Sequence, residues 1–359
     1  MRVKCQQMAK RRVLITGITG QDGSYLAEHL LDLGYEVWGL LRRTSLDPTQ
    51  RIAALLSPKR RINLIYGNVR DSGSLRSALE ESKPDEIYNL AAQSDVDISF
   101  KCPDETMETN FFGLGRLVEQ AIRFNPDVRI YQASTSEMFG NSPPPQSEQT
   151  PFTPVSPYGL SKVLAHEHFV ELYRQKHKLF ICSGFFFNHE SPRRSEHFVT
   201  RKITISLAEV KLGMQEPFAL GNLDARRDWG FAGDYVRAMH LMLQQDMPND
   251  YVVATGQSYS VREFVETAAR ALGIAIYWSG HGVDEVGTDA TGRVIVKIDK
   301  RFFRPAEVHS LRGDYSKVRK ELGWKPQTTF EEMVEMMVRS DFDRLSFSLK
   351  RPLAQPNAR

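Results

Sequence analysis

The chain has 359 residues, of which 41% are hydrophobic, so it can bury a large core and is neither disordered nor fibrous. Its 47 basic and 44 acidic residues nearly cancel, which argues against a general nucleic-acid binder. Cys5, Cys102 and Cys182 form no CxxC pair and no histidines stand at metal spacing, so we expect no metal site and a reducing, cytoplasmic setting. No segment approaches the length of a membrane span, and we expect no membrane partner.

Apolar strand-like runs alternate with helix-period segments in the first half of the chain. We expect strands at residues 12–16, 35–41, 62–66, 86–91, 128–133 and 179–187, and helices at residues 25–33, 74–81 and 105–124. This alternation is typical of a parallel sheet that helices cover on both faces. The sequence therefore predicts an α/β, Rossmann-type doubly wound fold with six strands.

After Asn188 the chain has longer loops rich in arginine, glycine and proline, with helices expected at residues 198–212 and 261–272. Ser260 and Glu263 have the spacing of a capping box before the second of these helices. We expect an N-terminal extension (1–11), a dinucleotide-binding domain with the catalytic residues (12–188) and a smaller, partly interleaved substrate lobe (189–345). Residues 346–359 are expected to form a poorly ordered tail.

A glycine-rich motif follows the first strand and leads into the first helix. It reads Gly17-Ile18-Thr19-Gly20-Gln21-Asp22-Gly23. Glycines at these places let the backbone approach a pyrophosphate, which then sits on the N–H groups of the helix start. The motif predicts a dinucleotide site.

The end of the second strand distinguishes between the two nicotinamide cofactors. An NAD site places an acidic residue there for the ribose hydroxyl, whereas an NADP site needs positive charge for the 2′-phosphate. This chain has Arg42-Arg43-Thr44-Ser45, and arginine pairs bidentately with phosphate. The sequence therefore favours NADP, with Arg42, Arg43 and Ser45 at the phosphate.

A second motif is Tyr158-Gly159-Leu160-Ser161-Lys162, preceded by Ser156-Pro157, which suits a helix start. Residues four apart lie on one helix face, so Tyr158 and Lys162 are neighbours. A phenol with its usual pKa of about 10 needs a nearby ammonium and a positive cofactor ring before it can act as a base at neutral pH. Tyr158 could then take a hydroxyl proton while hydride leaves the same carbon.

These motifs in this order resemble the extended short-chain dehydrogenase/reductase superfamily. Longer runs narrow the resemblance to the GDP-mannose 4,6-dehydratase family, over residues 12 to about 340: GITGQDGSYL from Gly17, STSE from Ser134, NHESPRR from Asn188 and GNLDARRDWG from Gly221. The resemblance implies a lyase that converts GDP-mannose to GDP-4-keto-6-deoxy-mannose and water, with NADP as a bound hydride carrier.

The resemblance also implies four catalytic residues. Tyr158 would take the C4 hydroxyl proton, Thr135 would hydrogen-bond the C4 oxygen, and Lys162 would hold the tyrosine and the nicotinamide ribose. Glu137 would act as base at C5 and as acid for the departing C6 hydroxyl. Epimerases and reductases need no base at C5, so Glu137 is the residue that favours a dehydratase.

Further binding residues follow from family position alone. Those expected at the cofactor, besides the motifs above, are Asn68, Val69, Leu90, Ala91, Ala92, Ser94, Tyr158, Lys162, His189 and Arg194. Those expected at the GDP-sugar are Ser94, Glu137, Asn188, Val199, Lys202, Gly221, Arg227, Arg304 and Glu307. Arg193, Arg226 and Arg301 are weaker candidates.

Two residues depart from the family pattern. Asn68 stands where an aspartate usually flanks the adenine, and asparagine keeps one acceptor but adds donors, which alters that contact. Glu105 stands where the family commonly has a tyrosine near the cofactor, so no cofactor contact is expected from it.

Three other functions stay open at this point. They are the same chemistry on a related GDP-sugar such as GDP-manno-heptose, an NADPH-dependent GDP-4-keto-sugar reductase, and an NADP sensor without turnover. By analogy with the family we also expect a homo-oligomer, a dimer or more specifically a tetramer, with the Arg42-Arg43 segment shared between subunits.

Overall fold

The computed structural model describes residues 10–214, 217–303 and 310–350. Its largest sheet has seven strands in the order β11-β6-β5-β4-β1-β2-β3, and every neighbouring pair is parallel. The strands are β1 (Arg12–Thr16), β2 (Glu36–Leu41), β3 (Asn63–Tyr66), β4 (Glu86–Asn89), β5 (Arg129–Thr135), β6 (Ile181–Phe186) and β11 (Tyr251–Val253). The Rossmann-type fold is confirmed, and the strand order reverses between β1 and β4, where such sheets bind ligands.

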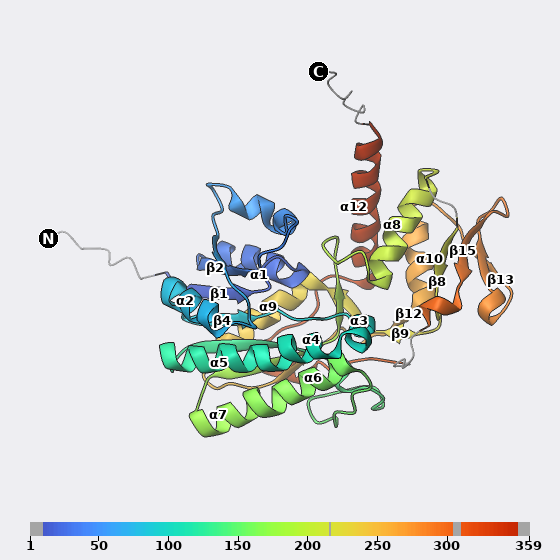
Figure 1. Cartoon of the computed structure of the whole chain (residues 1–359). Coiled ribbons are helices and arrows are strands. Elements are labelled where there is room, and N and C mark those ends of the chain that lie inside the picture. Colours follow the sequence, from blue (N-terminus) through green and yellow to red (C-terminus); the bar gives the residue numbers. More distant parts are fainter. Residues whose placement is uncertain (1–9, 215–216, 304–309, 351–359) are drawn as a thin grey trace, which may run out of the picture.

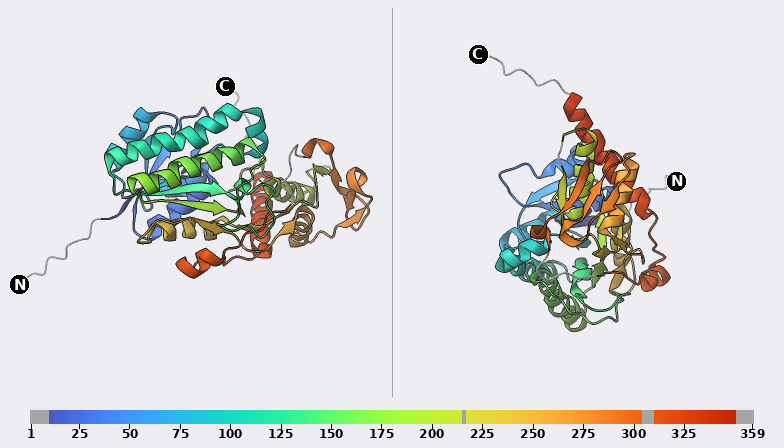
Figure 2. Two further views of the ribbon diagram at one scale, coloured as in Figure 1. Left: turned by 90° about the horizontal axis from the view of Figure 1, so that it is seen from below. Right: turned by 90° about the vertical axis from the view of Figure 1, so that its right-hand side faces the viewer.

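Helices cover both faces of this sheet (Figure 2). Successive side chains of a strand point to opposite faces of the sheet. Val13 and Ile15 of β1 accordingly pack in the hydrophobic cluster under one layer of helices, and Leu14 between them packs in a separate cluster under the other layer. The first layer contains α1 (Gln21–Asp32), α9 (Ala232–Leu243) and the 3-10 helix η1 (Thr49–Leu56). The second contains α2 (Ser72–Ser82), α5 (Gly113–Phe124), α6 (Pro157–Ala165) and the π-helical segment η4 (His166–Glu171), which leads into α7 (Leu172–His177).

A single helical stretch runs from Pro103 to Phe124 beside α6. It consists of α4 (Pro103–Met107), the π-helical segment η2 (Glu108–Phe112) and α5. The shorter α3 (Val96–Lys101) precedes it and also contacts α6. The helix expected at residues 105–124 is therefore present, with a widened turn in its middle.

A second lobe stands beside the large sheet and has its own core (Figure 1). Its four-stranded sheet has the order β13-β14-β15-β8. The strands are β8 (Phe218–Leu220), β13 (Tyr277–Ser279), β14 (Val286–Thr288) and β15 (Val294–Ile298), and the helices are α8 (Val199–Lys211), α10 (Val261–Ala271) and α12 (Phe330–Lys350). Two short pairs of strands lie where the chain crosses from one lobe to the other. They are β7 (Asn188–Glu190) with β10 (Trp229–Phe231), and β9 (Arg226–Arg227) with β12 (Tyr259–Ser260).

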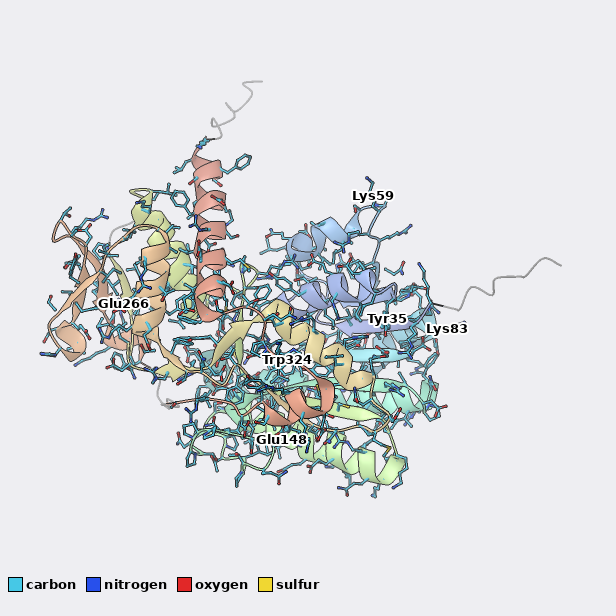
Figure 3. The ribbon with its side chains drawn as sticks, turned by 180° about the vertical axis from the view of Figure 1, so that it is seen from behind. Tyr35, Lys59, Lys83, Glu148, Glu266 and Trp324 are labelled. Atoms are coloured by element: carbon cyan, nitrogen blue, oxygen red, sulfur yellow. The ribbon has the colours of Figure 1, made fainter. Side chains whose placement is uncertain are left out.

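The two lobes interleave in sequence. β11 extends the large sheet by pairing with β6, and α9 packs on that sheet, although both come after Asn188. Trp324, which follows α11 (Ser316–Leu322), donates a hydrogen bond from its indole to the carbonyl oxygen of Asp234 at 2.9 Å and lies against α9 (Figure 3). The seventh strand was not expected from the sequence, because three residues are too short to show a strand pattern.

The two expected helix starts are confirmed. The Ser156 hydroxyl accepts from the Gly159 N–H at 3.0 Å, and Ser260 and Glu263 form a capping box. Residues 346–350, expected to belong to a poorly ordered tail, lie in α12, which continues to Lys350 because no glycine or proline interrupts it before Pro352. The part of the tail expected at 351–359 lies outside the described residues.

In the described ranges no helix combines the length and apolarity needed to cross a bilayer. The same residues contain no group of three or more His, Cys, Asp or Glu side chains that could hold a metal ion.

Candidate active site

A cavity of about 690 Å³ lies at the carboxyl edge of the large sheet and reaches into the second lobe. Residues of the glycine-rich motif line it, as do the ends of β2 to β6 and the first turn of α8. Its size is within the usual range for small-molecule sites. Both lobes thus contribute walls to one cavity at the switch point of the sheet.

The glycine-rich motif forms a cradle that side chains would fill. Gly17 has φ +70°, and a Cβ on it would lie 2.9 Å from the backbone nitrogen of Ala91. A Cβ on Gly23 would lie 2.3 Å from the carbonyl oxygen of Gly17. α1 starts at Gln21, with Gly20 as its N-cap and no side chain capping it, so the helix start is open to an anion. The cradle fits a pyrophosphate.

Asp22 and His189 form an ion pair that joins the motif to β7. Asp22 Oδ2 lies 2.8 Å from His189 Nε2, and His189 Nδ1 lies 2.7 Å from the carbonyl oxygen of Phe187. Both ring nitrogens face acceptors, so the imidazolium form satisfies both contacts. Burial disfavours the charge of His189, but the Asp22 carboxylate outweighs burial and raises the pKa of His189. Burial likewise disfavours the charge of Asp22, but His189 outweighs it and lowers the pKa of Asp22.

Arg194 is held against the same cavity. Its Nε lies 3.2 Å from Glu190 Oε2, and its guanidinium carbon lies 3.6 Å from the ring centroid of Phe198. Glu190 is 1% exposed and accepts a hydrogen bond from the Thr200 hydroxyl at 2.6 Å. These contacts fix the guanidinium at the cavity wall.

Thr135 and Glu137 come from the end of β5 and the 3-10 turn η3 (Ser136–Met138). Thr135 Oγ1 accepts from the Glu137 N–H at 3.2 Å, which caps the turn and orients both residues. Thr135 and Glu137 are 8% and 9% exposed, and both line the cavity. The turn places a carboxyl group two residues beyond a hydroxyl on the same wall.

Tyr158 enters the cavity from the first turn of α6. A Cβ on Gly159 would lie 2.7 Å from the carbonyl oxygen of Glu137, so α6 packs directly on the turn that carries the glutamate. Burial raises the pKa of Tyr158 to about 12, although the Thr135 side chain opposes this shift. The protein alone therefore keeps Tyr158 protonated, and a base role requires added positive charge.

Lys162 is one helical turn beyond Tyr158 and is 3% exposed. Its Nζ donates to the carbonyl oxygen of Ala133 at 2.7 Å and lies 6.0 Å from the Tyr158 ring centroid. Burial lowers the pKa of Lys162 to about 8. The ammonium is thus anchored to the end of β5 and does not bond the phenol directly.

Most residues expected at the cofactor line this cavity. They are Gly17, Thr19, Gly20, Gln21, Asp22, Gly23, Arg42, Asn68, Val69, Leu90, Ala91, Ala92, Ser94, Tyr158, Lys162, His189 and Arg194. Arg43 and Ser45 are exposed and are not among the described residues that line the cavity. The residue Arg51 on η1 does line it and donates to the carbonyl oxygens of Arg193 at 2.8 Å and Thr19 at 3.4 Å. No sequence motif marks Arg51, since it is a single arginine in a segment without strand or helix period.

The residues expected at the sugar nucleotide divide into two groups. Ser94, Glu137, Asn188, Val199, Lys202, Gly221 and Arg227 line the cavity, whereas Arg304 and Glu307 lie outside the described residues. Lys202 Nζ lies 3.4 Å from the centroid of the Phe302 ring, and a Cβ on Gly221 would lie 2.4 Å from the Phe302 carbonyl oxygen. Phe302 is a wall residue that the sequence did not indicate.

The three weaker arginine candidates are paired elsewhere. Arg193 bonds Glu28 at 2.7 Å, Arg226 lies 3.2 Å from Glu263, and Arg301 bonds Asp299 at 2.6 Å. None of them is among the described residues that line the cavity.

The sequence of this chain is similar to one family of known proteins. The family model described as GDP-mannose 4,6 dehydratase matches residues 14–337. GDP-mannose 4,6 dehydratase 1 of Arabidopsis thaliana is 50% identical over 343 residues, covering 93% of this chain and 90% of the relative. A GDP-mannose 4,6-dehydratase of Vibrio cholerae is 49% identical over 356 residues, covering 94% and 95%.

Solved structures confirm the fold. The dTDP-glucose 4,6-dehydratase DesIV of Streptomyces venezuelae, solved with NAD and TYD bound, has a TM-score of 0.78 at 24% identity, with 94% of this chain and 98% of that chain covered. RMD of Pseudomonas aeruginosa, solved with NADPH, has a TM-score of 0.73 at 21% identity, with 93% and 99% covered.

Proposed function

This chain belongs to the GDP-mannose 4,6-dehydratase family, and we propose that the cavity between its two lobes carries out that reaction with the residues described above. The reaction converts GDP-mannose to GDP-4-keto-6-deoxy-mannose and water, so the protein is a hydro-lyase. The observation that carries the residue assignment is the packing of α6 on η3, which brings Tyr158 to the wall that bears Thr135 and Glu137.

NADP is the cofactor, and the cavity fits it. The glycine cradle and the open start of α1 suit the pyrophosphate, and Arg42 at the end of β2 suits the 2′-phosphate. When bound, NADP would supply the hydride acceptor for C4 of the hexose and the hydride donor for C6. His189 and Arg194 add two cationic side chains to this part of the cavity, each paired with a carboxylate.

Tyr158 removes the proton of the C4 hydroxyl as the first step of the proposal. The positive cofactor ring and the Lys162 ammonium supply the charge that the buried phenol needs to ionise. Thr135 hydrogen-bonds the C4 oxygen as it becomes a ketone. The carbonyl of Ala133 holds Lys162 in position for this role.

Glu137 carries the elimination. The C4 ketone acidifies the C5 hydrogen, which Glu137 removes as a proton. The same carboxyl group then gives a proton to the C6 hydroxyl, which leaves as water while a C5–C6 double bond forms. C5 is reprotonated when C6 is reduced, so the cycle needs no net oxidant.

The sugar nucleotide is bound by the second lobe in this proposal. Asn188 Oδ1 is buried without a hydrogen-bond partner in the described residues, although it belongs to a residue that lines the cavity. A buried acceptor of this kind points to a ligand donor, and the hexose hydroxyls supply such donors. Lys202 and Arg227 add cations for the diphosphate.

The test is incubation with GDP-mannose and catalytic NADP⁺ in deuterated water. We expect a 4-keto-6-deoxy product with one solvent deuterium at C5 and no stoichiometric use of NADPH. Turnover of a GDP-heptose while GDP-mannose stays unchanged would overturn the assignment of GDP-mannose as the substrate. Net consumption of NADPH would favour the reductase. Binding of NADP without any product would favour a sensor.

We also propose a homo-oligomer, more specifically a tetramer. Phe100 on α3, Phe112 on η2 and Leu160 on α6 are 40%, 47% and 46% exposed, and both α3 and η2 contact α6. Exposed apolar groups gathered in this way are typical of subunit contacts. Analytical ultracentrifugation that finds a stable, active monomer would reject the proposal.

A reducing, cytoplasmic setting agrees with the free Cys102 and Cys182 and stays a proposal.

A further inference from the structure

The loop after β3 forms the end of the cavity nearest the β2–β3 side of the sheet. Gly67, Asn68, Val69 and Arg70 follow β3 directly, and all four line the cavity. In a dinucleotide fold the pyrophosphate lies on the loop after the first strand, and the adenosine half extends towards the strands that follow. This loop therefore faces the purine base of the cofactor.

Hydrogen bonds fix the orientation of Asn68. Its backbone N–H donates to Ser74 Oγ at 3.1 Å, and its carbonyl oxygen accepts from the Asp71 N–H at 2.9 Å. Its side-chain oxygen accepts from the Arg70 N–H at 3.0 Å. Because a backbone N–H can only donate, this contact requires oxygen, not nitrogen, on the loop side of the amide.

The amide nitrogen of Asn68 is consequently turned out of the loop. Among the described residues Asn68 Nδ2 donates no hydrogen bond. Arg70 adds a guanidinium to the same wall, 3.5 Å from Glu105 Oε1, and a guanidinium only donates. Glu105 itself does not line the cavity in the described part of the chain. The side chains of this loop thus offer donors to the base.

Donors and acceptors at this place select different purines. Adenine presents an amino group at position 6 and acceptors on its ring nitrogens, whereas a 6-oxopurine presents an acceptor at position 6. A carboxylate at residue 68 would accept from the adenine amino group and would face the lone pairs of a 6-oxo group. The Nδ2 donors of Asn68 can instead meet N7, which is an acceptor in both adenine and a 6-oxopurine, and in a 6-oxopurine they can also meet the 6-oxo oxygen.

We propose that Asn68 makes the cofactor site tolerant of the purine at position 6, so that it binds deamino-NADP, in which hypoxanthine replaces adenine, about as tightly as NADP. This inference rests on the proposed function, since it concerns the same cofactor site. Asn68 is a specificity-determining residue, and its effect is on binding.

The test is calorimetric titration of the full chain with NADP⁺ and with deamino-NADP⁺, at one salt concentration. We expect the two dissociation constants to agree within about threefold. In Asn68→Asp we expect deamino-NADP⁺ to bind about 10-fold or more weakly relative to NADP⁺, because a carboxylate then opposes the 6-oxo group. Asn141→Asp, at an exposed residue outside the cavity lining, is the matched control and should keep the wild-type ratio.

The outcomes separate the two proposals. Failure of NADP⁺ itself to bind would overturn the proposed function. Normal NADP⁺ binding with wild-type dissociation constants that differ by more than about threefold would overturn only the role of Asn68. An unchanged ratio in Asn68→Asp would also overturn the role of Asn68, provided that thermal unfolding shows the variant to be folded. If Asn68→Asp does not fold, Asn68→Ser and Asn68→Thr replace it. A wild-type ratio in both of them would contradict selection by the amide.

Discussion

A Cβ on Gly159 would lie 2.7 Å from the carbonyl oxygen of Glu137, so α6 sits against η3 without space for a side chain. The contact is with backbone, which cannot turn aside as a flexible side chain can. This close approach sets the distance between the helix that carries Tyr158 and the turn that carries Glu137.

We expect Gly159→Ala to move α6 away from η3 and to lower kcat by about 100-fold, as displacements near 1 Å at a catalytic centre do. Steady-state kinetics with GDP-mannose measures the effect. Glu167→Ala, at an exposed residue of η4, which directly follows α6, is the control and should stay near wild type. Full activity of Gly159→Ala would show that the contact does not position Tyr158.

Glu137→Gln should separate oxidation from elimination. Glutamine keeps the size of the side chain but cannot take the C5 proton, so we expect product formation to fall by about 10²- to 10⁴-fold. Oxidation at C4 should still occur, and bound NADPH should accumulate in a single-turnover absorbance measurement. Elimination of water at the wild-type rate would refute the role given to Glu137.

The Asp22–His189 pair predicts a pH-dependent stability. The pKa of His189 is raised on folding, so the stability that its charge contributes is present below the unfolded value of about 6.5 and is lost as pH rises through the raised value. Asp22 has a lowered pKa, so its contribution is lost only as pH falls from about 4 through that lowered value. Between these limits both charges are present.

His189→Gln keeps a neutral N–H donor but removes the charge. We expect it to destabilise the protein by about 2 kcal/mol near pH 6, with the difference shrinking as pH rises. Urea unfolding across this pH range measures it, and His281→Gln, at an exposed residue, is the control. A difference that grows with pH would contradict the imidazolium assignment.

Arg42 and Arg43 should differ in their effect on the cofactor. Arg42 lines the cavity and Arg43 does not, so Arg42→Gln should weaken NADP⁺ binding about 10-fold or more, while Arg43→Gln should have a smaller effect in a single protomer. NAD⁺ lacks the 2′-phosphate and serves as the control ligand in the same titrations. Equal losses for NADP⁺ and NAD⁺ would remove Arg42 from the phosphate site.

Features that depend on a few neighbouring residues could be predicted from the sequence. The Ser156 cap, the Ser260 capping box and the glycine turn after β1 each follow from contacts within one or two turns of chain. The helical spacing likewise put Tyr158 and Lys162 on one face. The identities of these residues, with the longer family runs, also pointed to the reaction.

Contacts between distant segments were decided only by the tertiary structure. Asp22 meets His189 across 167 residues of chain, Lys162 bonds Ala133 and not Tyr158, and Arg51 reaches the carbonyl oxygen of Arg193. β11 becomes the seventh strand because β6 offers it an edge, not because three residues prefer to be a strand. Local sequence determines turns, caps and helix faces through short-range sterics and hydrogen bonds, whereas these pairings exist only once packing has brought separate elements together.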